Sequence, residues 1–184
     1  EVQISSAVEI VRFHAASDRV EYGADLSGLA PLAEASLSVT DGLAIIARVA
    51  SALATLHTAG ESHGDLGPWS VRVGNGRVVL LTPPPGVAAG ALIAARVRHA
   101  GAPLSDAAFC SERALAGRKG GPEDDVYALA GLTHWMISRE LPVGRVDTSA
   151  AGHGHLRDLA YMVSGGLATS PGRRPPMTTC AWAL

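Results

Sequence analysis

The turn Gly74-Asn75-Gly76 joins two runs rich in β-forming residues, at 70–73 and 77–81. Glycine and asparagine tolerate the positive φ angles of a tight turn, so this pattern is a strong signal for a β-hairpin. Any fold for this chain must therefore place a hairpin near the middle of the sequence, between segments that are mostly helical.

Residues 41–58 carry apolar side chains at intervals of three and four, the spacing of an α-helix with one apolar face. Thr40 or Asp41 can cap its N-terminus, and Gly60 ends it. Helices outnumber strands, so the expected fold class is α+β and mainly α-helical. The other predicted elements are strands at 8–13 and 19–22, helices at 124–138, 156–167 and 177–184, and an extended surface segment at 82–109.

The composition is that of a globular chain. Of its 184 residues, 47% are hydrophobic and 17% are charged, whereas a disordered chain has few apolar residues and many charges. The formal net charge is −2, so no bulk basic field recruits nucleic acid or an anionic membrane. The sequence therefore predicts a weakly charged globular domain without a nucleic-acid partner.

Cys110 and Cys180 are the only cysteines, which is too few for a zinc site or a disulfide framework. A reducing compartment is therefore expected and the chain is assigned to the cytoplasm, with one disulfide between them left open. The longest uncharged stretch, residues 78–95, contains three consecutive prolines that would break a spanning helix. We predict no membrane span, and no signal peptide opens the chain.

Residues 56–66, Leu-His-Thr-Ala-Gly-Glu-Ser-His-Gly-Asp-Leu, follow a predicted helix and precede the hairpin. This arrangement resembles the catalytic loop of the protein kinases. Four downstream segments resemble, in order, the Ala-Pro-Glu segment, the start and the end of the central C-lobe helix, and the late Arg-Pro of that family: 109–113, 124–129, 139–142 and 171–175. The alternative is an unrelated helical protein that happens to contain His-Gly-Asp, which explains one match but not their order.

The resemblance implies structural roles for three residues. Glu112, in the Ala-Pro-Glu position, would form a buried ion pair with Arg174. Asp125, at a helix N-terminus, would accept backbone N–H bonds from the catalytic loop and hold its shape. The same residues could instead be ordinary capping or surface charges.

The positions that carry chemistry in the family depart from its pattern. After Asp65, the places of a lysine and an asparagine are taken by Gly67 and Ser70, and Thr82 stands in the place of the metal-binding aspartate. A neutral hydroxyl is a poor substitute for a carboxylate on Mg²⁺. We therefore expect no metal and no cofactor, and His63 and Asp65 are interpreted as vestigial parts of a catalytic loop.

The N-terminal part departs further. No Gly-rich loop precedes the hinge-like stretch 20–28, and Lys119, well after the catalytic loop, is the only lysine. The resemblance therefore implies residual N-lobe strands and a hinge-like segment at 1–38 and a kinase-like C-lobe at 39–184. Within the C-lobe it implies a catalytic-loop remnant at 63–70, an activation-segment-like stretch at 82–112 and a central helix at 124–138.

These departures lead to the expectation of a degenerate pseudokinase related to bacterial Ser/Thr protein kinases, which is not an enzyme but a protein-binding scaffold or regulatory module. A missing N-lobe would leave a face near the hinge for a partner or for self-association. A phosphopeptide-binding domain is a further possible partner. The content of alanine, glycine and arginine resembles that of actinobacterial proteins.

Two other functions stay open. The chain could be part of an atypical phosphotransferase that is completed by a partner chain or by residues before Glu1, which is either a natural start or a domain boundary. It could also be an ancillary substrate-binding domain of a biosynthetic enzyme. As a metal site, His153-Gly154-His155 is a weak ligand set, and a solvated loop explains it better.

Overall fold

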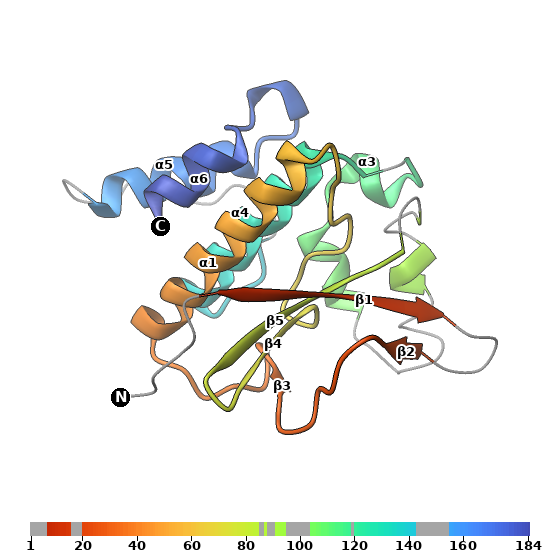
Figure 1. Cartoon of the computed structure of the whole chain (residues 1–184). Helices are drawn as coiled ribbons and strands as arrows, with labels where there is room; N and C mark the ends of the chain where they lie inside the picture. Colours follow the sequence, from red (N-terminus) through yellow and green to blue (C-terminus); the bar gives the residue numbers. More distant parts are fainter. Residues whose placement is uncertain are drawn as a thin grey trace.

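A computed structural model describes residues 7–15, 20–84, 87, 91–94, 104–118, 120–142 and 155–184 (Figure 1). A small sheet lies on one side and most of the helices lie on the other. The elements are β1 (Val8–Ala15), β2 (Val20–Tyr22), β3 (Ala30–Pro31), α1 (Val39–Thr58), β4 (Val71–Gly74), β5 (Arg77–Thr82), η1 (Leu104–Phe109), α3 (Glu112–Leu115), α4 (Pro122–Ser138), α5 (His155–Gly166), η2 (Pro171–Arg173) and α6 (Met177–Ala183).

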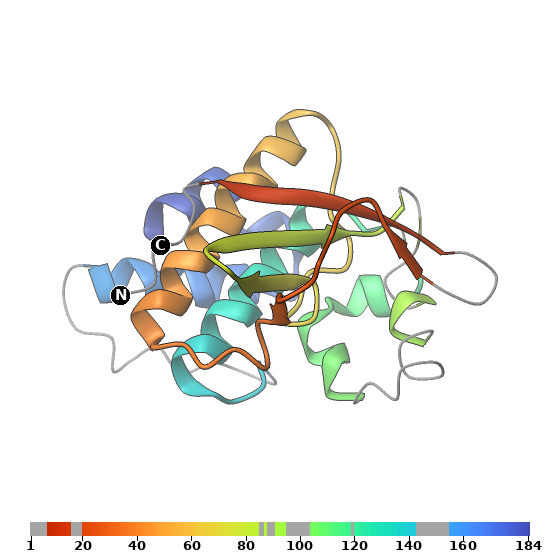
Figure 2. The ribbon, with the colours of Figure 1, turned by 60° about the horizontal axis from the view of Figure 1, so that its bottom comes forward.

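The predicted hairpin is present as β4 and β5, with Val73 opposite Val78. At its tip, Asn75 and Gly76 have positive φ angles of 50° and 71°, which is why this turn needs asparagine and glycine. The strand order is β2-β1-β5-β4-β3. β1 pairs in parallel with β5, from Val8 opposite Val78 onward, so the N-terminal strand lies beside the hairpin (Figure 2).

Helix α1 begins at Val39 and is capped by Ser38, whose hydroxyl accepts a bond of 3.1 Å from the Asp41 N–H. The predicted caps, Thr40 and Asp41, lie inside the helix, because the hydroxyl of Ser38 already satisfies one of its free N–H groups, that of Asp41. Among the helices that the structure describes, only α1 is long and apolar enough to span a membrane. Its apolar face is buried in the protein core, which accounts for that character.

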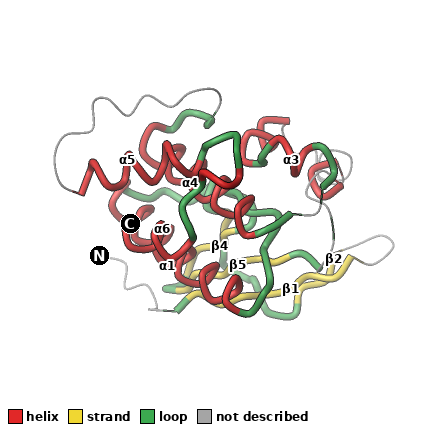
Figure 3. The backbone as a smooth tube through the Cα atoms, turned by 90° about the horizontal axis from the view of Figure 1, so that it is seen from above, coloured by secondary structure: helices red, strands yellow, loops and turns green. Residues whose placement is uncertain are grey.

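Helix α4 begins two residues earlier than the predicted start at Asp124, since Pro122 suits the first helical position. It is buried on several sides: α1, α5, α6 and η1 all pack against it. Figure 3, seen from above, shows α1, α4, α5 and α6 grouped together, with the strands to one side of them. Within the segment predicted to be extended, 82–109, residues 104–109 form the short helix η1.

Both faces of the sheet are buried. Side chains such as Val71 and Leu80 join the helices in the main core. On the other face, Val11, Val79 and Leu81 form a smaller cluster, partly covered by the segment 24–29. Strands from the first 38 residues therefore share one sheet and two cores with the hairpin that follows.

Candidate functional site

Asp125 lies in the first turn of α4, and its carboxylate points at the loop that precedes the hairpin. Its two oxygens accept backbone hydrogen bonds of 2.8 Å from the N–H groups of His63 and Gly64. One of them also accepts a bond of 2.8 Å from Nε2 of His57, at the end of α1. Because the side chain of Asp125 is only 1% exposed, these bonds form away from water and fix the shape of the loop.

His63 ties this loop to the end of β5. Its Nε2–H donates to the carbonyl oxygen of Leu81 at 2.9 Å, and its Nδ1 accepts from the Asp65 N–H at 3.2 Å. These two bonds specify a neutral imidazole with the proton on Nε2. Burial accordingly lowers the pKa of His63, although the nearby Asp125 acts in the opposite direction.

The positions of the two implied metal ligands are occupied by buried hydroxyls. Ser70 closes a turn, because its Oγ accepts from the Gly67 N–H at 3.1 Å and donates to the Gly67 carbonyl at 3.0 Å. Thr82 is 2% exposed, and its Oγ1 makes no hydrogen bond in the described part of the chain. Neither residue offers the carboxylate that Mg²⁺ favours, so the residues described here do not fit the kinase metal site.

Trp69 determines what position 67 can hold. Its indole lies against Gly67, where an added Cβ would come within 2.3 Å of the ring. The ring also packs edge-on against Phe109, with centroids 5.7 Å apart, and Nε1 donates to the Asp65 carbonyl at 3.2 Å. Sequence reasoning missed this arrangement, although a glycine two residues before a tryptophan is a signal for such a close approach.

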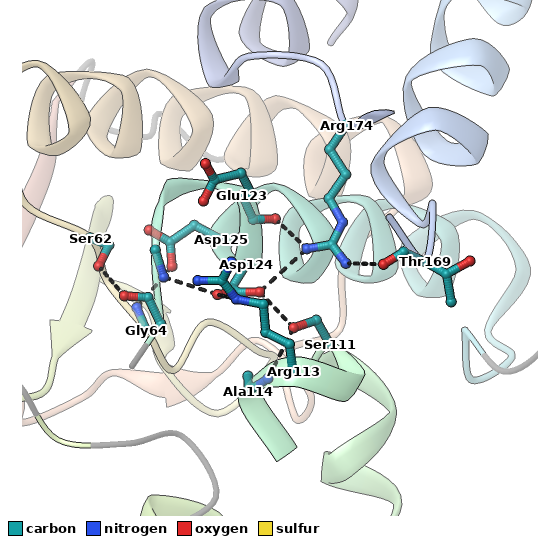
Figure 4. A network of polar contacts seen from close by, with 12 residues as sticks. Ser62, Gly64, Ser111, Arg113, Ala114, Glu123, Asp124, Asp125, Thr169 and Arg174 are labelled. Carbon is teal, nitrogen blue, oxygen red and sulfur yellow. Dashed lines mark hydrogen bonds and ion pairs between the residues drawn. The ribbon is translucent and has the colours of Figure 1, made fainter. Parts of the chain in front are cut away.

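Arg174 is a buried hub, but it does not pair with Glu112 as the resemblance implies. Its Nη1 lies 3.3 Å from Oδ1 of Asp124 and 2.9 Å from the carbonyl oxygen of Glu123 (Figure 4). Further bonds from its guanidinium reach the carbonyl oxygens of Ala168 and Thr169.

The reason lies in the cap of α3. The Ser111 hydroxyl caps this short helix and donates to Asp124 at 2.6 Å, so that Ser111 is buried and Glu112, the next residue, is exposed. Asp124 is therefore the carboxylate that the buried guanidinium reaches. Three consecutive acidic residues, 123–125, at the start of an apolar helix were the available sequence signal.

The remaining candidates are placed as follows. Asp65 lies in the loop and is 4% exposed. In the described part of the chain no three His, Cys, Asp or Glu side chains gather into a metal-binding group. His153, Gly154 and Lys119 lie outside the described residues. Cys110 and Cys180 are buried free thiols in the structure.

Comparisons with known proteins found similarity in structure only. No family model and no curated protein matches the sequence. The kinase domain of Mycobacterium tuberculosis PknI matches with a TM-score of 0.58 and 23% identity, over 88% of this chain and 62% of that domain. Another crystal structure of that domain matches with a TM-score of 0.62 and 23% identity, over 95% of this chain and 70% of that one.

These neighbours correct one expectation. Kinase domains are enzymes, so the prediction that this chain is not an enzyme is contradicted by the comparison. The replacements at positions 67, 70 and 82 are therefore not sufficient to show that the chain lacks enzymatic activity.

The likeness is one of fold, which in this chain consists of a small sheet, a loop held by Asp125, a hairpin and a buried central helix. The chain spans 62% of the first kinase domain that it matches. It therefore has a protein kinase-like α+β fold with a reduced N-lobe.

Proposed function

We propose that the chain is a protein-binding module of the kinase-like fold, with a scaffold or regulatory role in the cytoplasm that does not depend on ATP. The observation that carries this proposal is the outer edge of β1. The two buried free cysteines support a reducing compartment.

Strand β1 is only half covered along this edge. It pairs with β5 through residues 8–12, whereas β2 pairs only with Phe13, His14 and Ala15. Within the described residues, the backbone of 8–12 therefore has an unpaired edge on the side away from β5. Such an edge carries free N–H and C=O groups that can accept a strand from another chain.

Apolar side chains accompany this edge. Ile10, in the middle of β1, is 38% exposed, and Tyr22, at the end of β2, is 41% exposed. Tyr22 packs edge-on against Phe13, so its ring is held in place at the surface. A partner strand, or the same strand of a second copy, would bury both side chains while it satisfies the backbone.

Independence from ATP is supported by the catalytic loop. The Ser70 hydroxyl is engaged within its own turn, and the indole of Trp69 takes the space beside Gly67. A thermal-shift titration of the chain with ATP, with and without Mg²⁺, tests this part. We expect no metal-dependent rise in Tm, and such a rise would contradict it.

Binding through the edge is tested with Ile10→Lys, because a charged residue on an edge strand opposes strand addition. Ile137→Lys is the matched control, since Ile137 is 45% exposed on α4. Sedimentation velocity over rising concentration measures self-association. We expect the wild type and Ile137→Lys to associate and Ile10→Lys to stay monomeric.

If the wild type is monomeric, self-association is rejected and a partner strand is tested instead. A synthetic peptide with the sequence of residues 8–13 then serves as the probe. Slower hydrogen exchange at β1 in its presence supports the edge as a binding surface, and unchanged exchange contradicts it.

A second candidate is a phosphotransferase completed by a partner chain or by residues before Glu1. It is favoured by Asp65, which lies in the position of a catalytic base in a loop that Asp125 holds in shape. A metal-dependent affinity for ATP in the thermal-shift experiment would favour this candidate.

A further inference from the structure

A groove of about 470 Å³ lies on the helical side of the molecule, between the last turn of α1, the first turn of α4 and the segment from η2 into α6. Figure 1 shows these elements meeting on the side of α1 that faces away from the sheet. Ala54, Val126 and Met177 give it an apolar lining, together with four prolines. Its polar lining includes His57, Glu123 and Arg174.

The charge available in this groove is negative. The guanidinium of Arg174 is 2% exposed and already donates to Asp124 and to three carbonyl oxygens. The side chain of Glu123 is exposed, and its Oε2 lies close to Gly121, the residue that precedes α4. In Figure 4 this carboxylate turns away from the contact of Arg174 with Asp124.

His57 is another polar side chain in this part of the lining, and its Nε2–H donates to Asp125. A negatively charged ligand would meet the Glu123 carboxylate, whereas a cation would be attracted to it. A cation on an apolar stem would also match the aliphatic lining, because lysine and arginine bury their methylene groups and keep the charged head in water.

We propose that this groove binds an arginine or lysine side chain of a protein segment. The methylene stem lies on Ala54 and the lining prolines, above the buried Val126 and Met177, and the cationic head lies at Glu123. The inference rests on the proposed function in taking the ligand to be a protein segment, but it uses a surface separate from the β1 edge.

Occupancy of the groove is connected to the catalytic loop. His57 lines the groove and bonds to Asp125, which in turn holds the N–H groups of His63 and Gly64. A cation beside His57 changes the environment of this ring and hence of its bond to Asp125. His63 and Gly64 do not line the groove, but their amide resonances should respond when it is occupied.

The experiment is a ¹H–¹⁵N NMR titration of the full chain with the acetylated and amidated tripeptide Gly-Arg-Gly. The same tripeptide with citrulline in place of arginine is the neutral probe of equal shape. We expect the arginine peptide to shift the amide resonances of Thr58 and Thr178, with a smaller shift at Gly64, and the citrulline peptide to shift none of them.

Glu123→Gln removes the charge at the groove, and Glu34→Gln removes a charge from an exposed glutamate near the opposite end of α1. We expect Glu123→Gln to weaken binding of the arginine peptide about two- to five-fold, the range of one partly exposed ion pair. Glu34→Gln should leave it unchanged. Equal loss in both variants, or equal binding of the citrulline peptide, would overturn the proposal.

Ile10→Lys separates the two proposals. Because β1 lies on the other side of the molecule, we expect this variant to bind the arginine peptide as the wild type does. A groove that fails to bind while the β1 edge associates contradicts only the inference about the groove. Association that fails while the groove binds contradicts only the edge.

Discussion

The first turn of α4 and the loop before the hairpin lie side by side but are built in opposite ways. In α4, Asp124 and Asp125 are buried carboxylates, and each accepts several hydrogen bonds from other elements. In the loop, the positions that resemble metal ligands carry neutral hydroxyls, and Ser70 bonds only within its own turn. The residues that hold the loop in shape are therefore different from the residues at its metal-ligand positions, and each set can be changed without the other.

The largest effect is expected at Arg174. Arg174→Met takes the buried cation from Asp124 and leaves it, among the described residues, only Arg113, 3.4 Å away and 37% exposed. We expect a cost of about 3–5 kcal/mol in the free energy of unfolding. Urea denaturation measures this loss. A double-mutant cycle with Asp124→Asn should give a coupling of about 1–3 kcal/mol, and a cycle with Glu112→Gln about zero. A coupling energy between Arg174 and Glu112 instead would support the ion pair that the resemblance implies.

The next effect tests the support of the loop directly. Asp125→Ala removes the acceptor for His63, Gly64 and His57, and unsatisfied buried donors of this kind cost about 3 kcal/mol in total. Denaturation of Asp158→Ala serves as control, since Asp158 is exposed in α5. A cost equal to that of the control would mean that Asp125 does not hold the loop.

Gly67→Ala tests the loop region itself. The new Cβ would meet the Trp69 ring, so overpacking should cost about 1–3 kcal/mol. In the background of Trp69→Leu the same change should cost much less, because the obstructing ring is gone. Equal costs in the two backgrounds would show that the ring does not limit position 67.

The smallest effect is a dependence on pH. The pKa of His63 is lowered in the folded state by burial, so the unfolded chain binds a proton that the folded chain rejects. Stability is therefore complete above the unfolded value of about 6.5 and falls as the pH drops below it, by at most about 1.4 kcal/mol per unit. His63→Gln keeps a donor toward Leu81, and its unfolding should lack this slope between pH 7 and 5. An unchanged slope would assign the effect to another group.

Local patterns predicted most of the fold. The hairpin, the helices and the role of Asp125 depend on neighbours within a few residues or on a recognisable order of segments. The parallel pairing of β1 with β5 does not, because nothing in the strand sequences specifies a partner so far along the chain. Likewise, Arg174 pairs with Asp124 because Asp124 is buried, whereas Glu112 is exposed. Which of the two is buried follows from how three elements pack together.

At the loop, the sequence showed which residues replace those of the family but not what the replacements do. That Ser70 closes its own turn follows from backbone geometry, and that Trp69 covers Gly67 follows from a side-chain rotamer. Both the turn of Ser70 and the position of the Trp69 ring are properties of the folded chain, so they cannot be read from the sequence.

The pairing of β1 with β5 also has a consequence for the order of folding. Val8 is synthesised before its partner Val78, which follows only after α1, the loop before the hairpin and half of the hairpin. Contacts between residues far apart in sequence form slowly, because a long loop must close first. During synthesis residues 8–12 of β1 must therefore wait without their partner strand, although residues 13–15 can already pair with β2. The docking of β1 onto β5 is expected to be among the late steps that complete the sheet.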